Sequence, residues 1–163
     1  CCVSIRRSYP TNIIILVVMT LAFAVMVGII CSFHRVDQVV IAASATVVIT
    51  FVLTIFAMQT KIDFTSCGGV MCIISILFII FAITVSVYTA IWGRSKILMM
   101  VYCSIGALVF CLYIIFDTQM IMGGSNRQYQ ISPEDYIFAV TQLYVDIINL
   151  FLMLLRLIGH SEE

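Results

Sequence analysis

The sequence predicts an all-α, polytopic membrane protein that forms a helical bundle with five transmembrane helices. Of its 163 residues, 63% are hydrophobic and only 10% are charged, whereas a soluble domain is nearer half apolar and a quarter charged. The mean hydropathy is +1.20. Five apolar runs follow one another, each close to the ~20 residues that cross the ~30 Å hydrocarbon core of a bilayer. The lipid bilayer is therefore an expected partner.

The five runs are unbroken, which favours helices over the strands of a membrane barrel. Backbone groups in lipid must be satisfied within their own segment, and a barrel would need short alternating strands. The fourth run is apolar to about residue 116, and its helix is expected to continue to about 122. We expect one transmembrane domain over residues 1–163, with helices at about 12–33, 39–58, 70–92, 97–122 and 133–158.

The connections between the runs are short, which favours antiparallel neighbours in a compact bundle. The turn at about 93–96 follows Trp92, a residue that suits the membrane interface. The last helix has a clear start, because Ser132 is a suitable N-cap and Pro133 fits the first helical position. Basic residues are balanced between alternate loops, so the positive-inside rule leaves the orientation open.

Charge and cysteine usage exclude several classes of function. Eight basic and eight acidic residues cancel, so the chain lacks the electrostatic signature of nucleic-acid binding. The cysteines form no C-x-x-C pair, and neither His34 nor His160 has ligand spacing with them. This pattern argues against a zinc site or a disulfide framework. We expect no resident cofactor.

Two aspartates, Asp117 and Asp146, lie inside the last two apolar runs and are the candidates for function. A charge at membrane depth is costly, so it usually faces a partner or a water-filled cavity. At 100° per residue, one face of the last helix carries a polar stripe made of Asp135, Gln142, Asp146, Asn149 and Arg156. We interpret the stripe as a face that supports a functional site, and the alternative is a seam that only holds helices together.

The relative depth of the two aspartates decides whether they meet. If the fourth helix runs past Met122 towards Arg127, their depths differ by only ~5 Å at ~1.5 Å per residue. Adjacent antiparallel helices then bring the two carboxylates together. If the helix stops at Met122, the depths differ by ~12 Å and we expect no pair.

A pair of carboxylates indicates a pH-sensitive pathway for a hard cation. Two neighbouring carboxylates cannot both ionise cheaply, so they share a proton. When they are ionised, they offer the oxygen ligands that Ca²⁺ prefers. We predict transient Ca²⁺ contacts at Asp117 and Asp146, with neutral oxygens from Tyr113, Gln142 and Asn149.

An intramembrane aspartyl protease is a rival interpretation, because two aspartates can also activate a water molecule. Such proteases carry Gly-x-Gly-Asp at the second aspartate. Here Leu143-Tyr-Val precedes Asp146 and contains no glycine. We therefore expect no enzyme.

Several stretches spread along the whole chain carry a family resemblance. They are Cys1-Cys2 with Arg6-Arg7, residues 59–66 (QTKIDFTS), 116–119 (FDTQ), 132–136 (SPEDY) and 143–151 (LYVDIINLF). With them the chain resembles the transmembrane Bax-inhibitor-motif family, and within it the Lifeguard, or glutamate-receptor-associated, branch. The resemblance implies that the five helices are the third to seventh of a seven-helix bundle. It also implies two further helices and a cytosolic leader upstream, and it places Arg6, Arg7 and the fourth loop on the cytosolic side.

The resemblance also implies a function. The family is associated with Ca²⁺ leak from intracellular stores and with suppression of apoptosis, in the endoplasmic reticulum, the Golgi or the plasma membrane. Asp117 and Asp146 match its paired aspartates, which are linked to pH-dependent Ca²⁺ passage and neutralised by a basic residue of the second helix. The alternative is a non-conducting scaffold that inhibits death-receptor signalling through apoptosis-regulating membrane proteins. The resemblance implies no catalytic activity.

Overall fold

The computed structural model describes residues 11–123 and 136–162, and long helices account for nearly all of them. The five long helices are α2 (Thr11–Ser32), α3 (Val36–Gln59), α4 (Gly68–Trp92), α5 (Lys96–Met122) and α6 (Tyr136–Glu162). Each contains a segment that is long and apolar enough to cross a membrane, which confirms the predicted five-helix membrane fold. The residues on which we based the start of the last helix, Ser132 and Pro133, lie outside the described residues.

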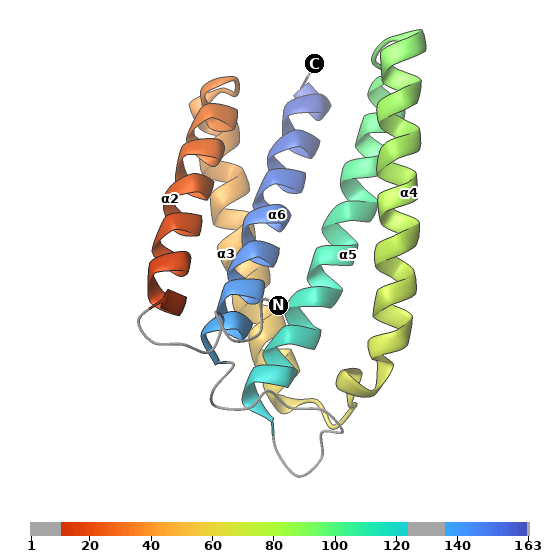
Figure 1. Cartoon of the computed structure of the whole chain (residues 1–163). Helices are drawn as coiled ribbons and strands as arrows, with labels where there is room; N and C mark the ends of the chain where they lie inside the picture. The colour runs from red at the N-terminus through yellow and green to blue at the C-terminus, as the bar shows by residue number, and fades with distance from the viewer. Residues whose placement is uncertain (1–10, 124–135, 163) are drawn as a thin grey trace.

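The helices stand side by side, with α2 and α4 at the two edges of the bundle and α6 between them (Figure 1). The most extensive contact joins α5 to α6, and α3 packs against both of these helices. Fully buried side chains such as Ile114 of α5 and Leu150 and Leu155 of α6 lie along this contact. The core of the bundle is therefore the seam between α5 and α6.

A glycine allows this seam to close. A Cβ atom on Gly106 of α5 would lie 2.9 Å from the sulfur of Met153 on α6 and 3.0 Å from the ring of Phe78 on α4. A side chain at this position would therefore require the Met153 side chain, and to a smaller extent the Phe78 ring, to shift. Small residues of this kind let transmembrane helices approach each other closely.

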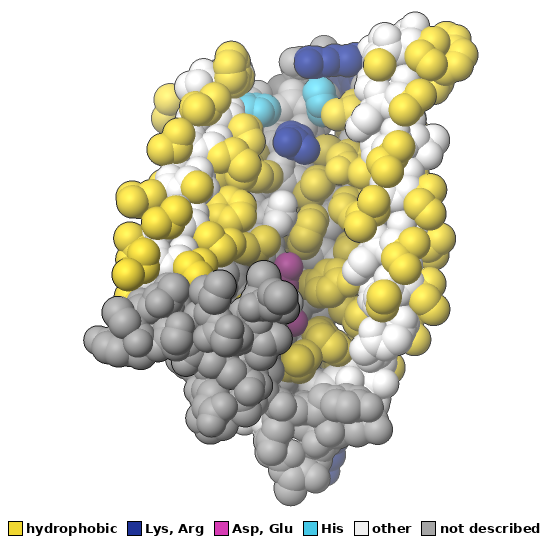
Figure 2. All heavy atoms as spheres, in the orientation of Figure 1, with side chains coloured by type: hydrophobic (Ala, Val, Ile, Leu, Met, Phe, Trp, Pro, Cys, Tyr) yellow, Lys and Arg dark blue, Asp and Glu magenta, His cyan; other side chains and the backbone are white. Residues whose placement is uncertain are grey.

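Apolar side chains predominate along α2 and α4 on the face seen in Figure 2. Large aliphatic residues of the edge helices are strongly exposed, among them Leu21 at 63%, Val25 at 64% and Leu77 at 60%. An outer surface of this composition suits hydrocarbon, which has no groups that could satisfy polar side chains. The exposed hydroxyls of Thr20, Thr84 and Ser104 donate to carbonyl oxygens of their own helices, so they are satisfied without water.

One buried side chain holds the connection between α3 and α4. Gln119 of α5 is 1% exposed, and its amide oxygen accepts a hydrogen bond from the backbone N–H of Phe64 at 2.9 Å. Its amide nitrogen donates to the backbone carbonyl oxygens of Ile62 at 3.1 Å and Ala57 at 3.3 Å. The connection includes the short 3₁₀ helix η1 (Phe64–Cys67). Gln119 thus supplies hydrogen bonds to backbone groups in and beside this irregular segment.

We expect Gln119→Leu to lower the free energy of unfolding by about 3 kcal/mol, because it removes three hydrogen bonds between the Gln119 amide and backbone groups. Gln59→Leu is the matched control, since Gln59 is exposed at the end of α3. Unfolding in detergent, together with proteolysis of the segment 60–67, measures the effect. Equal stability of the two variants would show that Gln119 does not hold this connection.

Candidate functional site

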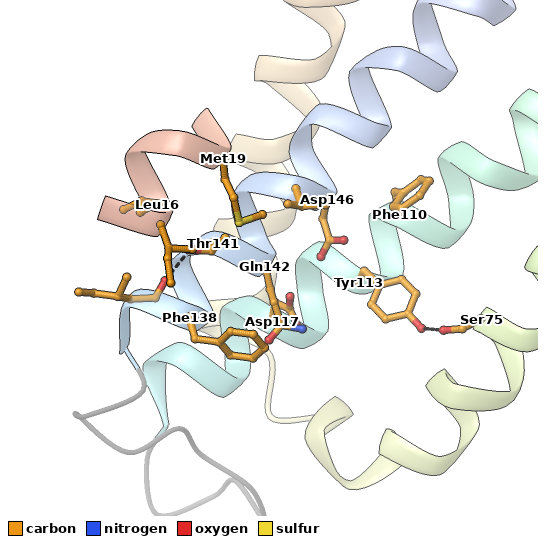
Figure 3. A pocket seen from close by; sticks show the side chains of 13 residues that line it. Leu16, Met19, Ser75, Phe110, Tyr113, Asp117, Phe138, Thr141, Gln142 and Asp146 are labelled. Carbon is orange, nitrogen blue, oxygen red and sulfur yellow. Dashed lines mark hydrogen bonds between the residues drawn. The ribbon is translucent and has the colours of Figure 1, made fainter. Parts of the chain in front are cut away.

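A cavity of about 630 Å³ opens between α2, α4, α5 and α6, and both candidate aspartates line it (Figure 3). Most of its wall is apolar, with Met19 from α2, Phe110 from α5 and Phe138 from α6. Asp117 comes from the C-terminal part of α5 and Asp146 from the N-terminal half of α6. Two acidic side chains therefore share one largely apolar space inside membrane-spanning helices.

The two carboxyl groups are close enough to interact electrostatically. Asp117 is buried, with 7% of its surface exposed, and Asp146 is half-buried. The Oδ2 atom of Asp146 is buried and has no hydrogen-bond partner among the described residues. A buried polar atom without a partner is costly, so packing alone does not account for this carboxyl group.

The depth argument from the sequence requires a correction. Helix α5 ends at Met122, where Gly123 takes a positive φ of 58° and donates its N–H to the carbonyl oxygen of Gln119. We expected such an end to keep the aspartates apart, and that expectation is wrong. Both side chains line one cavity and interact electrostatically. The end of α5 lies beyond the start of α6 (Figure 1), and this stagger adds to the difference in depth between the two aspartates, so the cavity spans that difference.

Tyr113 and Gln142, two of the predicted supporting residues, also line the cavity. The Tyr113 hydroxyl donates to the backbone carbonyl oxygen of Met71 at 2.8 Å and is hydrogen-bonded to the Ser75 hydroxyl. It therefore ties α5 to α4, and its ring faces the cavity (Figure 3). Sequence reasoning missed Ser75 because a single serine in an apolar run carries no signal until the register of the two helices is known.

The other two supporting residues do not line this cavity. The Asn149 side chain donates to the carbonyl oxygen of Val145 in its own helix at 2.9 Å. Arg156 lines a second cavity, at the other end of the bundle. Helical periodicity places these residues on one face of α6, but each turn moves them ~5.4 Å along the axis. Asp135 of the same stripe lies outside the described residues.

The predicted contact with Ca²⁺ stays a prediction. In the described ranges 11–123 and 136–162, no three His, Cys, Asp or Glu side chains gather into a metal site. Asp117 and Asp146 provide two carboxyl groups, and the amide of Gln142 lies in the same cavity. This set offers oxygen ligands, the type that Ca²⁺ takes, on helices that hold them inside the membrane.

Comparison with known proteins gives consistent matches over the whole chain. A family model described as "Inhibitor of apoptosis-promoting Bax1" matches residues 1–163. Protein lifeguard 3 of Mus musculus is 41% identical over 162 residues, covering 99% of this chain and 52% of that protein. Protein lifeguard 3 of Homo sapiens is 41% identical over 159 residues, covering 98% and 50%. Protein lifeguard 4 of Mus musculus is 34% identical over 151 residues, covering 93% and 59%. The chain spans about half the length of these curated relatives.

The interaction between the two carboxyl groups can be measured with a double-mutant cycle. We expect the effects of Asp117→Asn and Asp146→Asn on the free energy of unfolding to depart from additivity by about 1–3 kcal/mol, because each substitution removes the same interaction. Asp37→Asn combined with Asp146→Asn is the control, since Asp37 lies on the exposed start of α3. That pair should add within about 0.5 kcal/mol. Additivity in both cycles would contradict the contact.

Proposed function

We propose that this protein, which belongs to the family of inhibitors of apoptosis-promoting Bax1 because the family model covers the whole chain, conducts a pH-sensitive Ca²⁺ leak. In this proposal the leak suppresses apoptosis. One observation carries the proposal. Two interacting carboxyl groups, Asp117 and Asp146, share a cavity between membrane-spanning helices. A structural role alone does not require charged groups at such a position, because neutral polar residues also hold membrane helices together.

The chemistry of the pair supports a cation as the permeant species. Ionised carboxylates are hard oxygen ligands that suit Ca²⁺, and their cost in an apolar environment is reduced when a cation neutralises them. Protons compete with Ca²⁺ for the same oxygens, so occupancy of the pair by a proton opposes occupancy by Ca²⁺. In this proposal, Asp117 and Asp146 are both the ligands of the passing ion and the groups that sense pH.

The proposed setting is a membrane that encloses a Ca²⁺ store, the endoplasmic reticulum or the Golgi, with the plasma membrane as the alternative. The integral, multi-pass character of the protein follows from its five apolar helices. A leak from a store lowers the amount of Ca²⁺ that a death signal can release, which connects the two parts of the proposal. The proposed role involves Ca²⁺ as a permeant ion, not as a resident cofactor, and includes no catalytic step.

Ca²⁺ flux from liposomes that contain the full-length protein tests the proposal. We expect Asp117→Asn and Asp146→Asn each to lower the flux by about tenfold, because a charged hydrogen-bonding or ligand group contributes ~1.5–3 kcal/mol. We also expect the dependence of the flux on pH to flatten in both variants. Asp37→Asn is the matched control, since its carboxylate is 72% exposed. Unchanged flux and unchanged pH dependence in both cavity variants would overturn the proposed leak.

A scaffold that acts through protein partners is the second candidate. The description of the family supports it, because that description names inhibition of a protein, Bax1, and no ion. Survival of cells that receive a death signal separates the candidates. If Asp117→Asn and Asp146→Asn abolish flux and also lose at least half of the protection, the leak is the protective activity. If both variants lose flux but protect fully, the protein acts as a scaffold.

A further inference from the structure

A second cavity, of about 740 Å³, lies at the end of the bundle that is remote from the aspartates. The turn between α2 and α3, the end of α4, the start of α5 and the end of α6 surround it. Figure 2 shows Lys, Arg and His side chains gathered at this end of the molecule, with the acidic side chains lower on the same face. The two cavities therefore differ in the sign of the charge that they present.

Among the described residues, the ionisable side chains that line the second cavity are all basic. Arg35, Arg94 and Arg156 line it together with His34 and His160, and no Asp or Glu of the described residues does so. Arg35 forms an ion pair with Asp37 at 3.1 Å, on the exposed side of the turn. Neither Arg94 nor Arg156 forms an ion pair with a described residue. Helix C-termini attract single cations, but this effect does not explain three arginines from three elements around one space.

Close packing between α6 and the turn from α2 to α3 forms one wall of this cavity. A Cβ atom on Gly159 of α6 would lie 3.0 Å from the imidazole ring of His34. Glycine at this position lets α6 approach the turn between α2 and α3. The His34 ring in turn lies 3.4 Å from the side-chain oxygen of Gln38, measured from Nδ1. The basic groups are therefore held by packed helix ends and not only by exposed loops.

The level of the cavity matches the headgroup region of a bilayer. Trp92 is 71% exposed at the end of α4 and stacks on Tyr88 with ring centroids 5.4 Å apart. Exposed Trp and Tyr at helix ends mark the membrane interface, and Arg94 follows Trp92 by two residues. The wall also includes the apolar side chains of Ile30 and Phe33, which continue the outer surface that faces the acyl chains.

We propose that this cavity binds a phosphate group at the membrane surface, either in the headgroup of an anionic phospholipid or as a free anion. Arginine matches phosphate through parallel, charge-assisted hydrogen bonds, and the three arginines that line this cavity can supply several of them. Arg156 approaches the phosphate from α6 and Arg94 from the end of α4. The apolar wall favours the lipid, because it offers a surface for the acyl chains of the same molecule.

The first arm of the test measures lipid retention. The protein is reconstituted in nanodiscs of phosphatidylcholine with a minor share of phosphatidylglycerol, and the lipid that remains bound is counted by native mass spectrometry. We expect Arg156→Gln and Arg94→Gln each to lower retention of phosphatidylglycerol by about tenfold, because each removes a charged hydrogen-bond donor. Lys61→Gln is the matched control, since it removes one positive charge from an exposed loop at the other end.

The second arm uses inorganic phosphate with the protein in a neutral detergent. Phosphate is expected to raise the melting temperature of the unmodified protein and of Lys61→Gln. If both arginine variants lose this rise, the result supports the site with a free anion as ligand. Selective loss of phosphatidylglycerol supports the site with a lipid as ligand. If the arginine variants match Lys61→Gln in both arms, the proposal is overturned. Arg94 is exposed after the end of α4, so Arg94→Gln keeps the test informative even if Arg156→Gln fails to fold.

Discussion

Lipid offers no hydrogen bonds, and every feature of this protein follows from that constraint. Backbone groups are satisfied inside long helices, and large aliphatic side chains face outwards. Some buried polar side chains satisfy irregular backbone, and others line a cavity. Gln119 illustrates the first case, because its amide serves the non-helical backbone before α4. Asp117 and Asp146 illustrate the second case, because they line a cavity between four helices.

The seam between α5 and α6 connects the fold to the site. Gly106 lets these helices pack closely, and their stagger sets the positions of Asp117 and Asp146 along the membrane normal. The Tyr113 hydroxyl joins α5 to α4 through Met71 and Ser75, on one side of the cavity. Asp117 and Asp146 thus line the same cavity because the surrounding packing determines the register of the helices. An attraction between the carboxyl groups is not needed.

Length, hydropathy and periodicity were sufficient to predict the five helices, because each of these is a property of a single segment. They were also sufficient to identify Asp117 and Asp146, since a charge in an apolar run is conspicuous in any register. These sequence properties did not predict contacts that depend on the relative position of two helices. The depth argument treated a difference in depth as enough to separate Asp117 from Asp146, although one cavity spans both, and Ser75 had no signal without its neighbour on α5. Contacts between helices depend on stagger and rotation, which a single segment does not encode.

The polar stripe of α6 shows how one sequence pattern can serve two sites. Asp146 lines the acidic cavity and Arg156, ten residues later, lines the basic cavity, about 15 Å further along the helix axis. Between them, the Asn149 side chain bonds to its own helix, and the buried residues Leu150 and Leu155 fill the seam. Apolar packing therefore separates two groups of opposite charge on the same helix. If both proposals hold, α6 presents a carboxylate to a cation at one depth and a guanidinium to an anion at the other. A single amphipathic face then carries two sites with opposite charge preference.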